Sequence, residues 1–296
     1  MNVPNYPMLR EELAARLSFL PDKPEETADS TLRALWFTAA GTPRSAPAAM
    51  EGDLPELAEA QQQGLRELLD RRLAGVPLAH LTGRQQFLGL EMLAGADALV
   101  PRKETELLAR TAIDAVQSLP AADRKPLVVD VCSGSGNVAL AIAQAVPAAQ
   151  VHGADLSDAA VRLAVRNAAH LGLSRVDFRV GDLLAPFDQD GFIGRIDVLT
   201  CNPPYINRAK VERMPTEIAA HEPRLAFDGG ALGISILMRL LDEAPRFLAP
   251  RGWLIFEVGA GQGAGLLKRL GASGKFTEIT PAEDEAGVIR VIAARR

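Results

Sequence analysis

From residue 127 onward, short apolar runs alternate with segments whose apolar residues recur at helical spacing. The apolar runs have the length and β-branched content of buried strands, and they cover residues 127–132, 150–155, 176–180, 196–201, 253–258, 276–280 and 288–293. The helical segments end near residues 146, 171, 247 and 270. Strands that alternate with helices form a mostly parallel sheet with helices on both faces. The sequence therefore predicts an α/β fold for this part of the chain.

The N-terminal part of the chain has helical patterns and no strand pattern. Apolar residues at helical spacing predict helices over 8–20, 30–40 and 54–74. Pro21, Gly41 and Gly75 lie at or just past the ends of these helices, and Pro55 would fall in the first turn of the third helix. We therefore expect residues 1–85 to form a small helical domain.

The stretch between these two parts predicts a β-hairpin. Its short apolar runs are interrupted by Gly89 and Gly95. We accordingly expect three parts, namely the helical domain over 1–85, a hairpin linker over 86–100 and the α/β domain over 101–296.

The composition is that of an ordinary globular protein, with 48% hydrophobic residues, 23% charged residues and a net charge of −5. The first 85 residues hold 9 Lys and Arg against 12 Asp and Glu, so neither the whole chain nor this segment resembles a basic arm that binds phosphate backbones.

Cys132 and Cys201 are the only cysteines and end apolar runs, so we expect both to be reduced. With no basic and apolar leader, and no apolar run of the roughly 18 residues that span a bilayer, we expect a cytoplasmic protein.

A glycine-rich turn follows the first predicted strand and precedes a helix. It consists of Cys132, Ser133, Gly134, Ser135 and Gly136. Glycines allow a backbone to approach a ligand closely, and the N–H groups at the start of the following helix face that ligand. The spacing also matches the dinucleotide fingerprint, so it fits NAD as well as S-adenosylmethionine.

Three carboxylates and one apolar residue belong to the same predicted cofactor site. Asp155 ends the second strand, where it can bind ribose hydroxyls or cap the next helix. Asp182, with Leu183 beside it, follows the third strand and can accept from an adenine amino group or cap the next turn. Asp130, near the end of the first strand, can accept from a ligand's ammonium group or hold the glycine turn.

Asn202, Pro203, Pro204 and Tyr205 follow the apolar run at 196–201, and therefore lie at the carboxyl end of a predicted strand, where open α/β sheets bind ligands. The two prolines fix φ and supply no N–H, and they hold the preceding asparagine in an extended conformation. Such a turn presents carbonyl groups and the Asn202 amide outward, so it can accept two hydrogen bonds from an –NH2 group beside an aromatic ring. The alternative is an ordinary loop, since Asn and Pro are common turn residues.

Other catalytic patterns are missing from the sequence. His80, His152, His170 and His221 have no metal-ligand spacing with either cysteine, so no metal is expected. No serine lies in a Gly-x-Ser-x-Gly elbow, and hydrolysis is therefore not indicated.

Taken in order, the glycine turn, Asp155, Asp182 and the Asn202–Tyr205 segment resemble the class I S-adenosylmethionine-dependent methyltransferases that act on planar –NH2 groups. A closer resemblance is to the HemK/PrmC family, the glutamine methyltransferases of peptide-chain release factors. The motifs that carry it lie at 77–83 with Phe87, at 100–106, at 221–230, at 256–259 with Gln262, and at 284–290. The resemblance covers about residues 76–296, and residues 1–75 only by their helical character.

This resemblance implies a catalytic domain with a Rossmann-like sheet of seven strands, S-adenosylmethionine as cofactor, and an N-terminal helical domain that helps to grip a protein substrate. The substrate would be the glutamine of a release factor's Gly-Gly-Gln motif, methylated on its side-chain amide nitrogen. Asn202 and the Pro203 carbonyl would each accept one amide hydrogen, with Tyr205 packed against the amide plane. We expect a monomer that contacts neither nucleic acid nor membrane.

Three positions depart from the family pattern and keep alternatives open. Cys132 replaces the usual glycine, as in the branch that modifies a ribosomal protein, Glu104 replaces an aspartate, and Leu232 replaces an acidic residue. Alternative acceptors are a ribosomal protein glutamine, a small-molecule amide or the amino group of a nucleic-acid base. An NAD enzyme and a noncatalytic cofactor-binding or interaction module are further alternatives.

Overall fold

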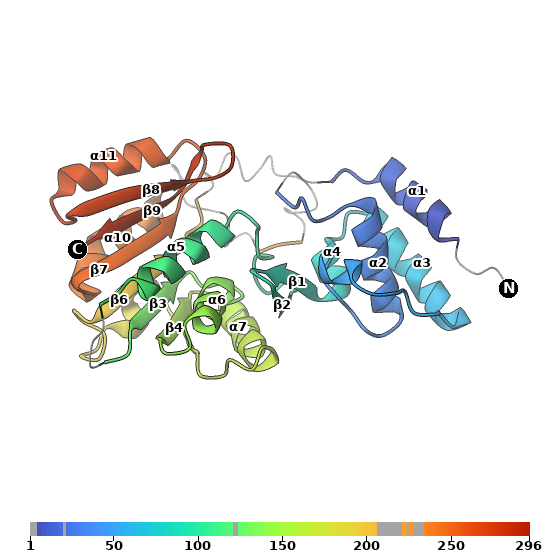
Figure 1. Ribbon diagram of the computed structural model, residues 1–296, viewed down its shortest axis with the longest axis horizontal. Helices are drawn as coiled ribbons and strands as arrows, with labels where there is room; N and C mark the ends of the chain where they lie inside the picture. The colour runs from blue at the N-terminus through green and yellow to red at the C-terminus, as the bar shows by residue number, and fades with distance from the viewer. Residues whose placement is uncertain are drawn as a thin grey trace. The chain divides into compact units, whose positions relative to one another are not determined.

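The structure is a computed structural model that describes residues 5–19, 22–120, 124–205, 221–223, 225, 227 and 234–296. The chain divides into two compact units (Figure 1). The first contains Met1–Lys103 and Met214–Glu222, and the second contains Glu104–Arg213 and Pro223–Arg296. Leu232 and Pro21, both used in the sequence analysis, lie outside the described residues.

The first unit consists of helices around one apolar core, followed by a β-hairpin. Its elements are α1 (Tyr6–Arg16), α2 (Ala28–Ala39), the 3₁₀ helix η1 (Ala48–Met50), α3 (Glu59–Leu73), α4 (Leu78–Thr82), β1 (Arg84–Phe87) and β2 (Leu90–Leu93). Helix α2 contacts α1, η1, α3 and α4, and its Leu32 and Leu35 are fully buried. Burying one such side chain stabilises the fold by about 1.5–3 kcal/mol. Reciprocal hydrogen bonds between Thr27 and Ser30 fix the residue at which α2 begins.

The third helix begins later than predicted, and Pro55 is not part of it. The Trp36 indole Nε1 donates to the Pro55 carbonyl at 2.8 Å, which holds this stretch as a loop against α2. The Ala58 N–H donates to the Gln61 side chain at 2.9 Å, so helix α3 begins at Glu59. A contact between distant segments has therefore overridden the local helical pattern.

The predicted hairpin is present as β1 and β2, which pair antiparallel from Arg84↔Leu93 to Phe87↔Leu90. Its first strand begins at Arg84, inside the stretch for which no strand was predicted. The structure groups the hairpin with the helical unit.

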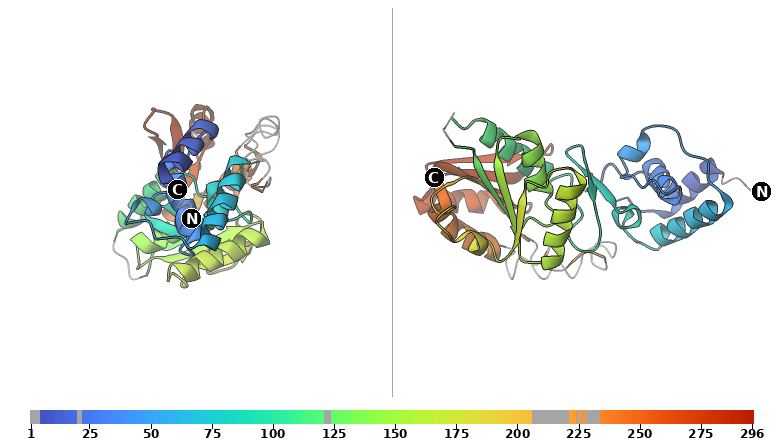
Figure 2. Two further views of the ribbon diagram at one scale, coloured as in Figure 1. Left: turned by 90° about the vertical axis from the view of Figure 1, so that its right-hand side faces the viewer. Right: turned by 90° about the horizontal axis from the view of Figure 1, so that it is seen from below.

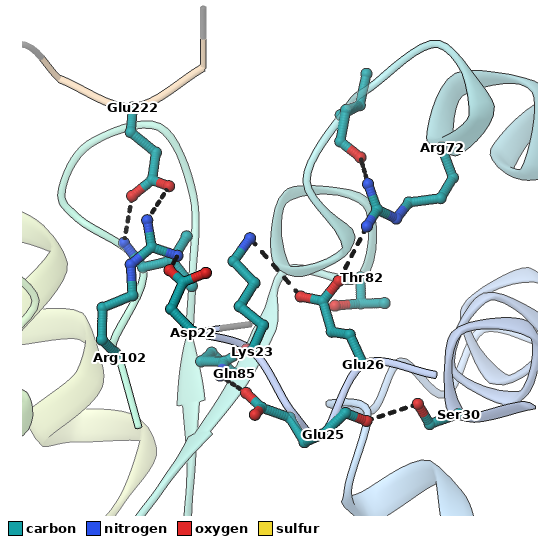
Figure 3. Close-up of polar contacts among 12 residues, drawn as sticks. Asp22, Lys23, Glu25, Glu26, Ser30, Arg72, Thr82, Gln85, Arg102 and Glu222 are labelled. Carbon is teal, nitrogen blue, oxygen red and sulfur yellow. Dashed lines mark hydrogen bonds and ion pairs between the residues drawn. The ribbon is translucent and has the colours of Figure 1, made fainter. Parts of the chain in front are cut away.

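Two groups of buried ion pairs lie in the first unit (Figure 3). Arg72 Nη2 lies 3.0 Å from Glu26 Oε2, and both side chains are almost completely buried. Arg102 Nη2 donates to Glu222 Oε1 at 2.6 Å, while the Val100 N–H donates to the other oxygen at 3.0 Å. Because a charge taken out of water costs several kcal/mol unless it is paired, these contacts specify which segments pack together. The contacts of Glu222 with Val100 and Arg102 therefore hold residue 222 beside the residues that follow the hairpin.

The second unit contains a seven-stranded sheet with the strand order β5-β4-β3-β6-β7-β9-β8 (Figure 1). The strands are β3 (Leu127–Val131), β4 (Gln150–Asp155), β5 (Asp177–Val180), β6 (Ile196–Cys201), β7 (Leu248–Glu257), β8 (Glu278–Glu283) and β9 (Ile289–Arg295). The pairs from β5 to β7 are parallel, and β9 runs antiparallel between β7 and β8. This confirms the predicted fold, the Rossmann-like sheet of the class I S-adenosylmethionine methyltransferases.

Helices cover both faces of this sheet. The described helices are α5 (Glu106–Gln117), α6 (Asn137–Ala145), α7 (Asp158–His170), the 3₁₀ helix η2 (Ala185–Phe187), α10 (Ser235–Phe247) and α11 (Gly263–Ser273). Alternate residues of β3, Val129 and Val131, share an apolar core with Leu240 of α10 and Leu266 of α11. Figure 2 shows α6 and α7 on the opposite face from α10. Among the described residues, none of the helices combines the length and the apolar character needed to cross a membrane.

The strand order reverses direction between β3 and β6. The chain proceeds from β3 to β4 and β5 on one side, and then returns to β6 and β7 on the other. Right-handed connections therefore leave the adjacent strands β3 and β6 in opposite directions and open a crevice at their carboxyl ends. Any ligand site of this sheet is expected there.

Candidate active site

The glycine turn begins where β3 ends. Cys132, Gly134 and Gly136 have φ values of 57°, 53° and 82°, and Gly136 caps helix α6. A non-glycine residue in the left-handed region costs on the order of 1–2 kcal/mol, so the backbone at Cys132 favours glycine. The Ser133 N–H donates to the Ala154 carbonyl at 3.0 Å and so attaches the turn to β4.

The Phe178 ring on β5 packs against the glycine turn and against β4. A Cβ atom placed on Gly153 would lie 2.5 Å from this ring, and one placed on Gly136 would lie 2.8 Å from it. Both positions therefore need glycine for close packing, in addition to the backbone conformation of Gly136. The sequence analysis did not identify this role of Phe178.

Asp155 connects the turn to the end of β4. Its Oδ2 accepts from the Gly134 N–H at 2.8 Å, and its Oδ1 accepts from the Ser157 N–H at 2.9 Å. The predicted alternative that Asp155 caps the next helix is wrong, because Ser157 is the N-cap of α7. Burial raises the pKa of Asp155, while the backbone N–H groups oppose that rise. A carboxylate has about four acceptor sites, so Asp155 can still accept from a ligand hydroxyl.

Asp130 lies on β3, just before the glycine turn, and is 1% exposed. The Thr200 hydroxyl on β6 donates to its Oδ1 at 2.7 Å, which links the two strands that border the crevice. Burial raises the pKa of Asp130 to about 7, against the lowering effect of the Thr200 hydrogen bond. Near neutral pH this carboxyl group is therefore poised between its neutral and charged forms.

Asp182 and Leu183 form the turn after β5. The Asp182 side chain pairs with Arg239 Nη2 at 2.9 Å instead of capping the next turn, and both side chains are about half exposed. Exposed pairs of this kind contribute only about 0–1 kcal/mol, so a ligand can displace Arg239 at little cost. Leu183 is buried and has a φ of 48°, which fixes the shape of the turn.

The predicted acceptor corner, residues Asn202–Tyr205, lies beside the glycine turn. Cys201, the last residue of β6, pairs in register with Val131, the last residue of β3, so the corner and the turn leave neighbouring strand ends. The thiols of Cys132 and Cys201 are free, and burial raises the pKa of Cys201. Parallel strands lie about 4.8 Å apart, so a ligand held by the turn is within reach of the corner.

Asn202 is partly exposed and its amide group is oriented by a neighbour. Its Nδ2 donates to Thr105 Oγ1 at 3.1 Å, so Oδ1 is the atom of this amide that can accept hydrogens. Pro203 is buried, whereas Pro204 and Tyr205 are partly exposed. Neither proline has an N–H, so their carbonyl groups act as acceptors only.

Tyr205 is held at both ends. Its hydroxyl lies 3.0 Å from Glu104 Oε1 and 3.0 Å from Glu257 Oε1, while its carbonyl accepts from Gln262 Nε2 at 3.1 Å. Arg290 Nη2 forms an ion pair with Glu104 Oε2. The sequence analysis assigned no role to these neighbours of Tyr205, although all four belong to the motifs of the family resemblance.

Comparisons with known proteins identify the family. The "Methyltransferase domain" family matches residues 123–267, and the "PrmC N-terminal domain" family matches residues 13–83. The release factor glutamine methyltransferase of Geobacter sulfurreducens is 36% identical over 230 residues, which cover 78% of this chain and 77% of that protein. The protein of the same name from Bradyrhizobium diazoefficiens is 34% identical over 97% of this chain and 93% of its own length. The chain belongs to the release factor glutamine methyltransferase family.

Among solved structures, the N-terminal domain of human METTL16 in complex with SAH has a similar fold. Its TM-score is 0.53 at 16% identity, over 76% of this chain and 82% of that chain. At this identity the similarity supports the methyltransferase fold alone.

Two buried hydroxyl groups in the glycine turn lack partners. Within the described part of the chain, neither Ser133 Oγ nor Ser135 Oγ has a hydrogen-bond partner, and both residues are less than 5% exposed. Buried hydroxyls are costly unless they are hydrogen-bonded, so a polar ligand at the turn would satisfy them.

Three of the four histidines contact other aromatic rings. His152 packs against Phe192 and contacts Asp177, and His80 lies edge-on to His221. The described residues include no group of three or more His, Cys, Asp or Glu side chains that could hold a metal ion.

Proposed function

We propose that this protein transfers a methyl group from S-adenosylmethionine to the side-chain amide nitrogen of the glutamine in the Gly-Gly-Gln motif of a peptide-chain release factor. The names of its relatives support the substrate. The observation that carries the proposal is the acceptor corner, which lies at the strand end next to the glycine turn. The reaction needs a cofactor site and an acceptor site that adjoin in this way.

The residues around the turn fit the cofactor. Its ribose hydroxyls suit the Asp155 carboxylate, and its adenine amino group suits Asp182 or the backbone near Leu183. Asp130 can balance the cofactor's ammonium group, because its carboxyl group is close to ionising at neutral pH. The unpartnered hydroxyls of Ser133 and Ser135 provide further contacts. When bound, S-adenosylmethionine supplies a methyl group on a positively charged sulfur.

The acceptor corner suits a primary amide. An amide nitrogen is a weak nucleophile because its lone pair is delocalised, so its orientation determines whether it reacts. Asn202 Oδ1 and the Pro203 carbonyl would each accept one amide hydrogen, and the Thr105 hydrogen bond keeps Oδ1 in place. Tyr205 would pack against the amide plane. Catalysis would then consist mainly of positioning and electrostatic stabilisation, without a strong general base.

We further propose that the second unit carries catalysis and that the helical unit contacts the release factor. We also propose that the protein acts as a cytoplasmic monomer without nucleic acid. The net charge of −5 supports the absence of nucleic acid, and the free state of both cysteines supports a cytoplasmic protein.

The test replaces Asn202 by alanine and measures transfer of labelled methyl groups to a purified release factor. We expect Asn202→Ala to lower kcat by about 100-fold or more, the size of effect seen when one oriented hydrogen-bonding group is removed from an active site. Calorimetry should give an unchanged Kd for S-adenosylmethionine. A release factor in which the Gly-Gly-Gln glutamine is replaced by glutamate serves as the control substrate, since it has no amide hydrogens.

Three outcomes would refute the proposal: no label on the release factor, equal labelling of the glutamate control, or full activity of Asn202→Ala. A salt-sensitive affinity for RNA or DNA, with label on a base, would instead favour a nucleic-acid acceptor.

A further inference from the structure

The Tyr205 hydroxyl faces two carboxyl groups, Glu104 and Glu257, at equal distances of 3.0 Å. A phenol has one proton, so it can donate to only one of them. The other contact is a hydrogen bond only if the second carboxyl group is protonated and donates to the phenol oxygen. The geometry therefore requires one more proton than the hydroxyl supplies.

The surroundings indicate which carboxyl group holds this proton. Glu104 is partly exposed and forms an ion pair with Arg290. Glu257 is 1% exposed at the end of β7. Burial, followed by the charge of Glu104, raises the pKa of Glu257 to about 7, while the contacts with Thr105 and Tyr205 and the charge of Arg290 oppose the rise.

We propose that Glu257, in its protonated form, and Glu104 are positioning residues that hold the Tyr205 ring in the acceptor corner. The hydrogen bonds run in one direction, from the Glu257 carboxyl to the Tyr205 hydroxyl and from that hydroxyl to the Glu104 carboxylate. Arg290 completes the chain by binding Glu104. This inference rests on the proposed function, since it assigns the corner to the acceptor amide.

The other end of Tyr205 is held by the loop after β7. Gln262 donates through Nε2 to the Tyr205 carbonyl and accepts through Oε1 from the Gly259 N–H at 2.9 Å. A Cβ atom on Gly259 would lie 3.1 Å from the Tyr205 ring, so the ring packs closely against the backbone there. With this end fixed, the hydroxyl contacts determine how the ring is oriented.

Loss of the Glu257 proton would break the chain. Two carboxylates would then face one hydroxyl. Among the described residues, the charge of Arg290, which also interacts with Asp284, would offset their repulsion only in part. The Tyr205 ring would be less firmly held, so acceptor turnover should fall as the pH rises above about 7, whereas cofactor binding should not depend on this proton.

The experiment compares Glu257→Gln and Glu257→Ala with the wild-type protein between pH 6 and 9. The wild-type kcat should fall by roughly tenfold or more between pH 7 and 9, as expected when one protonated group is needed. Glu257→Gln keeps a donor that does not titrate, so its profile should be flat over this range, at a kcat lowered by less than about tenfold. Glu257→Ala should be about 100-fold less active at every pH, since an oriented hydrogen-bonding group is lost.

Glu278→Gln, an exposed change on β8 of the same sheet, is the matched control and should keep the wild-type profile. Asp130 also titrates near neutral pH, so the assay uses saturating S-adenosylmethionine, and calorimetry follows the cofactor Kd separately. An alkaline fall in Glu257→Gln equal to that of the wild type would overturn the proposal.

A second measurement is independent of the acceptor. Infrared spectra at pH 6, recorded in an Asp130→Asn background because Asp130 would give a carboxyl band of its own, should contain a protonated carboxyl band that Glu257→Gln lacks and Glu278→Gln retains. An unchanged band in Glu257→Gln would refute the proton assignment. If the band is lost but no release factor is methylated, the positioning chain stands and the proposed function fails.

Discussion

Replacement of Asp130 by asparagine should change how stability depends on pH. The folded-state pKa of this buried carboxyl is about 7, against 3.8 for an unperturbed aspartate. Between about pH 4 and 7 the folded protein therefore keeps a proton that the unfolded chain has released. The free energy of unfolding falls as the pH rises through this window. Above about pH 7 the stabilisation that the Asp130 proton gives the folded protein is lost.

The magnitude follows from the size of the shift. One pKa unit corresponds to about 1.4 kcal/mol, so a shift of roughly three units gives roughly 4 kcal/mol in total, of which roughly 3 kcal/mol is lost between pH 5 and pH 8. Asp130→Asn has no titrating group and keeps an oxygen that can accept from Thr200. Relative to the wild type, it should therefore gain roughly 3 kcal/mol of stability from pH 5 to pH 8.

Urea unfolding, followed by Trp253 fluorescence, measures this difference. Trp253 lies on β7 in the same sheet, and a Trp36→Phe background removes the other tryptophan of the chain. Because Glu257 is present in both proteins, its own pH dependence cancels from the comparison. Asp190→Asn, at an exposed position, is the control and should differ from the wild type by the same amount at every pH. A pH-independent difference for Asp130→Asn would refute the argument.

Two further changes test packing in the two units. Gly153→Ala places a methyl group 2.5 Å from the Phe178 ring and should lower the free energy of unfolding by about 1–3 kcal/mol in urea titrations, whereas Gly191→Ala, with no atom within 4 Å, should change it little. Glu222→Ala leaves the buried Arg102 without its closest partner and should cost about 3–5 kcal/mol, visible as a lower Tm. An unchanged Tm would show that this pair does not stabilise the first unit.

The sheet was predictable because most of its strands coincide with a short apolar, β-branched run in the sequence. The β-branched run at 196–201 became β6 with the predicted bounds, and the two extended runs predicted at 276–280 and 288–293 correspond to β8 and β9. Helix α5 (Glu106–Gln117) was not predicted, although Leu108, Ala112 and Val116 recur at helical spacing on its buried face. Strand β7 begins at Leu248, not at 253, since its first residue pairs with Ile196 across an irregular register.

The candidate site was predictable only where its residues follow a strand directly. The glycine turn and Asn202 were found because strand ends can be recognised locally. Phe178 was not found, since its role depends on the close approach of β5 and β4 to Gly136. The neighbours of Tyr205 come from segments near residues 104, 257 and 290, and only the sheet order brings those segments together.

The same strand order also explains why both halves of the site depend on one pair of strands. The turn leaves β3 and the acceptor corner leaves β6, so the hydrogen bond from Thr200 to Asp130 fixes the distance between the two halves. Antiparallel β9 then sets the corner's outer boundary, because the Val258 N–H donates to the Arg290 carbonyl at 2.8 Å and so places the Arg290 guanidinium where it can pair with Glu104. Under the proposed function, cofactor and acceptor would thus be aligned by the backbone of the sheet, and the side chains at its edge would adjust the orientation of Tyr205.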